Sequence, residues 1–265
     1  MRGDSGLFGP DSVVWRIHAD PVMLVGGLRA VLVQALEPRA MAAVDQHSAF
    51  REDPWGRLQR TTSFVVRTTY GDTADADAAI GKVRAVHSRI RGVDPVTGSA
   101  YSADDPDLLL WIHAVEVDSF LHAYRTYAGR VDAADADRYV EEMTRVGERV
   151  GVPAADLPRT LGELREYLGS VTGLQVTPAA RDGLRIVLFP PMQVRYRPLW
   201  AVPTTAVVAI LPSYARRLYG IPWFAPAGLP VRAGVFALSR ALNAMTPPPP
   251  ALRAARERIA GRVAA

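Results

Sequence analysis

Apolar residues recur at steps of three and four positions along most of the chain, which is the spacing of one face of an α-helix. Leu24, Leu28, Val31 and Ala35 follow one another in this way. This spacing, bounded by start and stop residues, predicts ten helices. They span residues 21–36, 54–70, 74–91, 106–127, 133–150, 160–170, 178–187, 199–219 (broken at Pro203 and Pro212), 230–245 and 251–263.

The predicted helix ends carry local signals. An Asp-Pro pair supplies an N-cap oxygen, followed by a residue whose missing N–H is not needed in the first turn. Three helices begin in this way, at Asp20-Pro21, Asp53-Pro54 and Asp105-Pro106. Glycine, which favours the end of a helix, follows the last turn of four helices at Gly71, Gly92, Gly129 and Gly151.

Extended structure has little support in the sequence. Short apolar runs occur within residues 187–196, but the prolines around them lack the N–H that a strand ladder needs. No internal repeat of fixed period is present. The pattern predicts an all-α protein with one domain over residues 1–265, in which a final helix within 246–265 follows the run Pro247–Pro250 and docks on the rest.

The composition is that of a folded globular chain and narrows its chemistry. The 265 residues are 49% hydrophobic and 22% charged, which excludes wholesale disorder. There is no cysteine, so disulfides, thiolate-bound metals and a cysteine nucleophile are excluded. A metal would have to be held by the five histidines, by carboxylates, or by a cofactor that brings its own ligands.

The formal net charge is +4 and the isoelectric point is about 9.6, yet the basic residues are scattered. Lys82 is the only lysine, and the arginines are interleaved with acids, so a nucleic acid is not an expected partner. No apolar stretch has the length of a membrane span, and no signal-peptide core follows Met1. We therefore expect a soluble, cytoplasmic protein, and peripheral membrane contact and a homodimer stay open.

Arg57, Arg60 and Thr61 share one face of the predicted helix 54–70, because residues i, i+3 and i+4 project together. Two guanidinium groups and a hydroxyl form a donor-rich patch that suits an anion, a propionate or a metal-bound oxygen. The alternative is a solvated helix face whose arginines pair with Glu52 and Asp53.

His87 falls within the apolar stripe of the predicted helix 74–91. Both nitrogens of a buried imidazole must be satisfied, so His87 is either a hydrogen-bonded core residue or a ligand. Arg84 and Arg91 flank it at i−3 and i+4. Arginines around a buried histidine would suit the propionates of a haem.

His113 and Glu116 lie in one row of the predicted helix 106–127. His-x-x-Glu can chelate a metal, but di-iron helical bundles use Glu-x-x-His twice, together with two further Glu residues. Here the order is reversed and there is no second copy, so an ordinary buried hydrogen bond between the two is the plainer interpretation. Neither a nucleophile elbow nor a phosphate-binding Gly-Lys-Ser/Thr loop occurs, which argues against hydrolases and nucleotide enzymes.

Several segments together resemble one large family. They are Gly3–Ser12, Leu36-x-Pro38-Arg39-Ala40, Arg51–Thr61, Val86–Gly92, Tyr101–Pro106 and Leu211–Gly220. The family is that of the bacterial latex-clearing protein (rubber oxygenase) and the fungal mycophenolic-acid-pathway oxygenase, and the resemblance extends over essentially the whole chain. It implies a helical, globin-like core that holds b-type haem, and an oxygen-dependent reaction on an apolar substrate.

The resemblance also implies roles for particular residues. A helix histidine is the proximal iron ligand of the latex-clearing branch, and the matching position is His87. A distal helix of that branch carries Arg-x-x-Lys-Thr, whose lysine can cap the iron. This chain has Arg57-x-x-Arg60-Thr61 instead, and an arginine stays protonated and is a poor ligand. An open or water-bound distal side is therefore implied, with His113 as a further pocket residue.

Two functional hypotheses follow. The first is a haem b-dependent oxygenase that uses dioxygen or peroxide on a small or lipid-like apolar substrate. In it His87 binds the iron, Arg57 and Thr61 are catalytic, and the remaining cofactor contacts are Arg60, Arg84, Arg91 and His113. The second is a non-catalytic helical module that binds a hydrophobic ligand or a membrane surface, for which the apolar residues 199–211 beside several arginines are the support.

Overall fold

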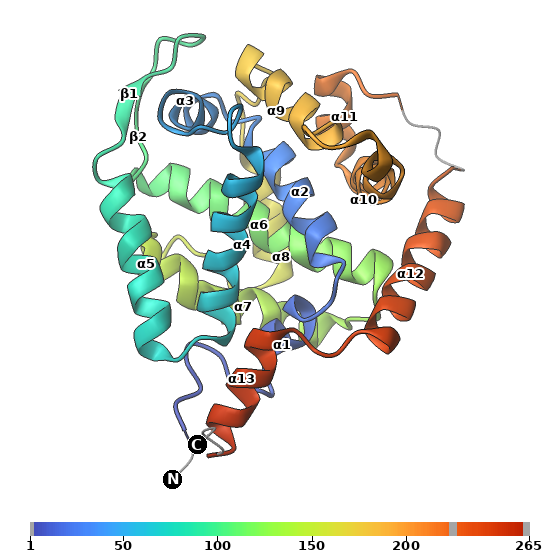
Figure 1. Ribbon diagram of the computed structural model, residues 1–265. Coiled ribbons are helices and arrows are strands. Elements are labelled where there is room, and N and C mark those ends of the chain that lie inside the picture. The colour runs from blue at the N-terminus through green and yellow to red at the C-terminus, as the bar shows by residue number, and fades with distance from the viewer. Residues whose placement is uncertain (1–2, 223–226, 262–265) are drawn as a thin grey trace.

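The computed structural model describes residues 3–222 and 227–261, and within them the chain is almost entirely helical (Figure 1). The prediction of an all-α protein is confirmed, with thirteen α-helices in the described ranges where ten were expected. In chain order the elements are α1 (Val13–His18), α2 (Met23–Gln34), α3 (Pro38–His47), α4 (Pro54–Tyr70), α5 (Thr73–His87), β1 (Arg91–Val93), β2 (Ala100–Ser102), α6 (Pro106–Tyr127), α7 (Ala133–Val150), α8 (Leu161–Ser170), α9 (Pro178–Leu188), the 3₁₀ turn η1 (Val194–Tyr196), α10 (Arg197–Ile210), α11 (Ser213–Tyr219), α12 (Gly228–Met245) and α13 (Pro250–Ile259).

Three features of the fold are missing from the sequence prediction. The short helices α1 and α3 flank α2, and α1 is capped by Ser12, whose Oγ accepts a hydrogen bond of 3.1 Å from the Trp15 amide. The third feature is the antiparallel hairpin of β1 and β2, in which Gly92 lies opposite Tyr101. Six helical residues or three strand residues are too few for a periodic pattern to show.

The Asp-Pro signals are right in two cases of three. Asp53 and Asp105 cap α4 and α6 with their carboxylates, as predicted. Asp20 does not cap α2, which begins three residues later. Its carboxylate instead accepts hydrogen bonds of 2.9 and 2.7 Å from Ser239 and Asn243 of α12. The carboxylate also accepts a local hydrogen bond of 3.0 Å from the Val22 amide, so these tertiary contacts add to a turn that precedes α2.

The predicted break at Pro203 is wrong, whereas the one at Pro212 is right. Pro203 lies inside α10, and its ring removes one hydrogen bond to the carbonyl of Leu199. Leu199 is 72% exposed, so water can satisfy that carbonyl. Among the described helices none is by itself long and apolar enough to cross a membrane; Val194–Ile210 and Ser213–Tyr219 reach the necessary length and hydropathy only together, with a bend of 113° between them.

The centre of the fold is the pair α2 and α6, which cross in close contact (Figure 1). A Cβ atom on Gly26 would lie only 2.9 Å from the Phe120 ring and 3.2 Å from its Cα, so only glycine allows this approach. Arg29 of α2, which is 4% exposed, ties neighbouring helices to the pair. Its guanidinium pairs with Asp118 of α6 at 2.8 Å and donates to the Ile210 carbonyl of α10 at 3.0 Å.

Helices α4 and α5 form an antiparallel hairpin in front of this central pair (Figure 1). Apart from its contacts with α5, α4 packs mainly on α1 and on the C-terminal helix α13. The side chain of Arg258 in α13 donates to the carbonyls of Asp4 and Tyr70, so hydrogen bonds link α13 to the N-terminal segment and to the end of α4. The short connection between α4 and α5 forms one end of this hairpin. The first residues of α4 and the last residues of α5 lie at the opposite end.

Candidate functional site

His87 is the last residue of α5, on the same helix face as the buried Ile80. The apolar stripe is shorter than the sequence predicts, because Val86 is 49% exposed and His87 itself is half-buried. Burial lowers the pKa of His87, and the Asp104 carboxylate partly opposes this effect. Its ring forms no hydrogen bond with any residue that the structure describes. The neutral imidazole thus keeps a nitrogen lone pair free.

Arg57 lies one turn into α4 and is held by a hydrogen bond of 2.7 Å from its Nη1 to the Ser48 hydroxyl. Burial and the neighbouring charge of Arg60 both lower the pKa of Arg57. Arg60 pairs with Asp53 at 3.2 Å, but Arg57 pairs with no carboxylate in the described ranges. A guanidinium surrounded by protein without a counter-charge is costly, so this position favours an anionic or polar ligand.

Thr61 lies one turn beyond Arg57 on the same face, and its hydroxyl donates to the Arg57 carbonyl at 3.1 Å. Because α4 and α5 run antiparallel, the start of α4 and the end of α5 lie level with each other. The fold therefore brings the Arg57 and Thr61 face and His87 to the same end of the helix hairpin. That they share one end follows from the topology and could be inferred from the sequence only by assuming the hairpin.

The other predicted arginines each have a protein partner. Arg60 forms the exposed ion pair given above. Arg84 donates to the Arg149 carbonyl of α7 at 3.2 Å. Arg91 in β1 is 3.6 Å from the carboxylate of Asp104, and both side chains are exposed. The arginines expected to hold propionates are thus already engaged with groups of the protein.

His113 and Glu116 lie one turn apart on α6, surrounded by protein. Burial lowers the pKa of His113 to about 4 and raises that of Glu116 to about 7. The hydrogen bond expected between the two is not formed, and neither bonds to another described residue. Yet every fully buried side-chain nitrogen and oxygen in the described ranges has a partner. The polar atoms of His113 and Glu116 are therefore not fully sealed from water, although both residues are largely buried.

Gly147 of α7 allows the side chains of His113 and Leu157 to pack closely against this helix. A Cβ atom on Gly147 of α7 would lie 3.0 Å from Nε2 of His113 and 2.7 Å from the side chain of Leu157. A larger residue would press on the imidazole. In the sequence, the only signal for the role of Gly147 is that a glycine stands within a helical pattern, where it is unfavourable unless packing requires it.

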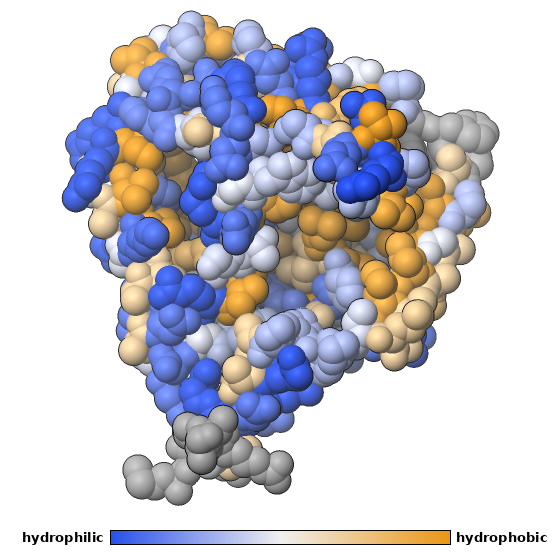
Figure 2. Space-filling view, in the orientation of Figure 1, coloured by the Kyte–Doolittle hydropathy of each residue, from blue (hydrophilic) through white to orange (hydrophobic). Residues whose placement is uncertain are grey.

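Figure 2 shows a hollow on the face of the molecule where α4 lies, between α4 and α12. Hydrophobic side chains border the hollow on the side of α12, and hydrophilic ones cover much of α4. An opening with one apolar and one polar wall suits a ligand that is mostly apolar and carries a few polar groups.

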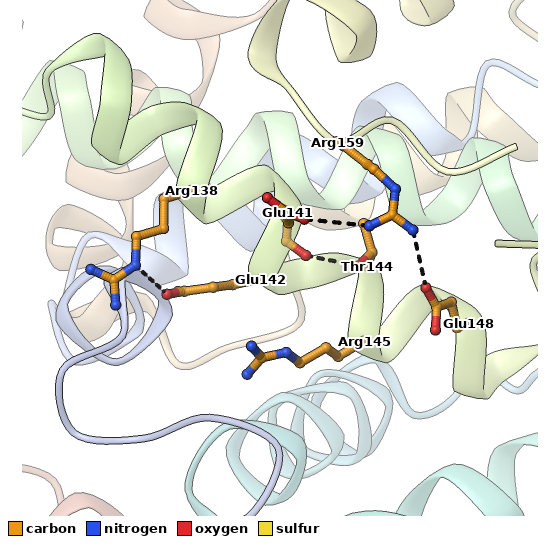
Figure 3. Close-up of a pocket in the computed structure, with 7 residues that line it drawn as sticks. All are labelled: Arg138, Glu141, Glu142, Thr144, Arg145, Glu148 and Arg159. Carbon is orange, nitrogen blue, oxygen red and sulfur yellow. Dashed lines mark hydrogen bonds and ion pairs between the residues drawn. The ribbon is translucent and has the colours of Figure 1, made fainter. Parts of the chain in front are cut away.

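A second hollow of about 410 Å³ lies on the outer side of α7 (Figure 3). It is lined by Arg138, Glu141, Glu142, Thr144, Arg145, Glu148 and Arg159. The opposite charges neutralise one another, as in the pair of Arg159 with Glu141 at 3.4 Å. A third hollow, of about 540 Å³, lies between residues 168–174 and α11. None of the residues predicted from the sequence lines either of them.

Residues 15–241 match the family model described as ER-bound oxygenase mpaB/B'/rubber oxygenase, catalytic domain. Two curated relatives, the uncharacterized proteins Rv2237 of Mycobacterium tuberculosis and Mb2261 of Mycobacterium bovis, are each 28% identical to the chain over 145 residues. That stretch is 54% of this chain and 55% of each relative, so the chain spans about half the length of the curated relatives it matches. No solved structure matches the chain. On the family match, this chain belongs to the family of mpaB/B' and rubber oxygenase catalytic domains.

Proposed function

We propose that this chain is a haem b-dependent oxygenase that acts on a small or lipid-like apolar substrate. Membership of the family gives the oxygenase activity in general terms. One observation carries the rest: His87 and Arg57 lie at the same end of the α4–α5 hairpin, and among the described residues the imidazole has no hydrogen-bond partner and the guanidinium has no counter-charge. Haem iron takes an axial imidazole, and its propionates or bound oxygen interact favourably with a cation.

The donor set fits haem better than it fits a metal held by side chains alone. Within residues 3–222 and 227–261, no three His, Asp or Glu side chains gather closely enough to hold a metal ion. Haem brings four nitrogen ligands of its own, so one histidine is sufficient.

When bound, haem would supply the iron at which oxygen is activated. His87 would bind that iron as a neutral imidazole, which its lowered pKa favours at neutral pH. Arg57, positioned by Ser48, would keep a fixed positive charge beside the open side of the site, with the Thr61 side chain next to it. Glu116, whose pKa is raised to about 7, can hold or release a proton near neutral pH.

His113 is the matched alternative as an iron ligand, because it is buried and its ring, like that of His87, bonds to no residue that the structure describes. Titration of the purified protein with haemin, followed by its absorption spectrum, distinguishes the two. We expect a Soret band that His87→Ala abolishes and that His113→Ala retains. His122→Ala removes an exposed histidine from α6 and is the control.

Two outcomes would contradict the proposal. If the Soret band is lost in His113→Ala but kept in His87→Ala, the iron ligand is His113 of α6 and not His87. A wild-type protein that stays colourless and refuses haemin would favour the non-catalytic helical module that binds a hydrophobic ligand.

A further inference from the structure

Acidic residues are unevenly distributed along this chain. Between Asp182 and Glu257 there is no Asp or Glu, although the same 74 residues contain nine arginines. All 27 acidic residues lie elsewhere, together with the other 22 basic ones. The expectation that arginines and acids are interleaved is therefore wrong for this segment. The net charge of +4 is small because the excess of acids in the rest of the chain offsets most of the positive charge of this segment.

The arginines of this segment are accessible. Those on η1, α10 and α12 are exposed and form no ion pair in the part of the chain that the structure describes; they are Arg195, Arg197, Arg232 and Arg240. Elsewhere about half of the exposed arginines have an acidic partner, as Arg16 has in Asp135 at 2.6 Å, whereas in this segment Arg185 alone of the described exposed arginines has one. The segment thus presents positive charge that its own fold leaves uncompensated.

Large apolar side chains are exposed in the same segment. Of the sixteen that the described residues expose, eleven lie between residues 189 and 245. The five most exposed, at 72–83%, are all among them: Phe189, Val194, Leu199, Leu229 and Met245. A soluble protein scatters single apolar residues over its surface, but a concentration of this kind marks a contact surface.

Helix α12 shows why these side chains stay exposed. Only Val235 and Ser239 of its 18 residues are buried, and hydrogen bonds from Ser239 and Asn243 to Asp20 hold it by one side. The same side of the helix packs on α6 and α10, and most of its remaining residues are exposed. Figure 2 shows hydrophobic side chains over α12 and its surroundings, next to the hollow beside α4.

We propose that this surface docks on an anionic lipid bilayer. We call it the α10–α12 surface and define it by Val194, Leu199, Leu229 and Met245 with Arg195, Arg197, Arg232 and Arg240. Apolar side chains would enter the boundary between headgroups and acyl chains, while the arginines bind lipid phosphates. The contact that we propose is peripheral: no single described helix has the length and hydropathy of a span, and the two apolar segments Val194–Ile210 and Ser213–Tyr219 are bent by 113° to each other. The proposal rests on charge and exposure alone and does not need haem.

A bilayer fits these observations better than a nucleic acid does. Nucleic acids would use the arginines but would gain little from isolated aliphatic side chains such as Leu199 and Met245. A bilayer uses both kinds of side chain at once. Because the hollow beside α4 adjoins this surface, an apolar substrate dissolved in lipid would reach it without crossing water.

Vesicle flotation of the full chain tests the proposal. We expect the protein to float with vesicles of phosphatidylglycerol and phosphatidylcholine, to float far less with phosphatidylcholine alone, and to lose binding at high salt. Removing both charges in Arg195→Ser/Arg197→Ser should weaken partitioning by about 25-fold, roughly fivefold for each arginine. Arg89→Ser/Arg165→Ser makes the same charge change at exposed positions of other parts of the fold and should bind as wild type.

The apolar contribution needs its own variant. Leu199→Ser/Leu229→Ser changes two exposed residues, so the fold should survive, which circular dichroism checks. Weaker flotation of this variant supports docking into the bilayer interface. Unchanged flotation, or a wild type that binds single-stranded DNA and ignores anionic vesicles, would overturn the proposal. So would equal loss of binding in the control pair.

Discussion

Replacing Glu116 by glutamine removes a carboxyl group whose ionisation is costly in the folded protein. Burial raises its pKa from 4.5 to about 7. Because the folded pKa is the higher one, the contribution of this group to stability is present below pH 4.5 and is lost as the pH rises through 7. At about 1.4 kcal/mol per pKa unit, the loss reaches about 3 kcal/mol above that range. Because the carboxyl is not fully sealed from water, this is an upper limit.

Urea unfolding of wild type and Glu116→Gln tests this reasoning. We expect the two proteins to have similar free energies of unfolding at about pH 4.5, and the variant to be more stable by up to about 3 kcal/mol at about pH 8. Glu166→Gln changes an exposed carboxyl on α8 and should stay within about 0.5 kcal/mol at both values. An advantage of Glu116→Gln that is the same at both pH values, or larger in acid, would refute the burial of Glu116.

Three further results are expected. Arg57→Ala should keep its helix content and haem content, but its turnover rate should fall by ~10²–10³-fold. A loss of haem in this variant would contradict the role of Arg57 on the side where oxygen binds. Arg60→Ala removes an exposed arginine that already pairs with Asp53, so the haem content per chain and the turnover should both stay near those of the wild type. Gly26→Ala should lower the free energy of unfolding by about 1–3 kcal/mol, because its Cβ would lie 2.9 Å from Phe120, whereas Gly27→Ala, with its nearest contact at 3.8 Å, should be neutral or stabilising in thermal unfolding.

Most of the helices could be predicted because their signals are local. Periodic apolar positions and capping side chains depend on neighbours within one or two turns, as at Asp53 and Asp105. Prediction failed where a distant residue decides the outcome. Asp20 binds α12 instead of capping α2, and Pro203 is tolerated in α10 because the carbonyl it frees is accessible to water.

The site could be predicted only in part, for a similar reason. The sequence suggests which side chains can bind an anion or a metal, and it places Arg57 and Thr61 on one helix face. It cannot show that Arg57 lacks a carboxylate partner while Arg60 has one. Nor can it show that His113 and Glu116 fail to bond to each other. These properties depend on how α4, α6 and α7 pack, and they decide whether a side chain is free to bind a ligand.

The most direct test of the central claim is chemical rescue of the iron ligand. In His87→Gly the imidazole ring is removed and a space of its size remains, so free imidazole can take its place. We expect this variant to bind haem weakly, and added imidazole to restore the wild-type Soret band and haem affinity. A His87→Gly protein whose spectrum and haem affinity equal those of the wild type would show that His87 is not the ligand.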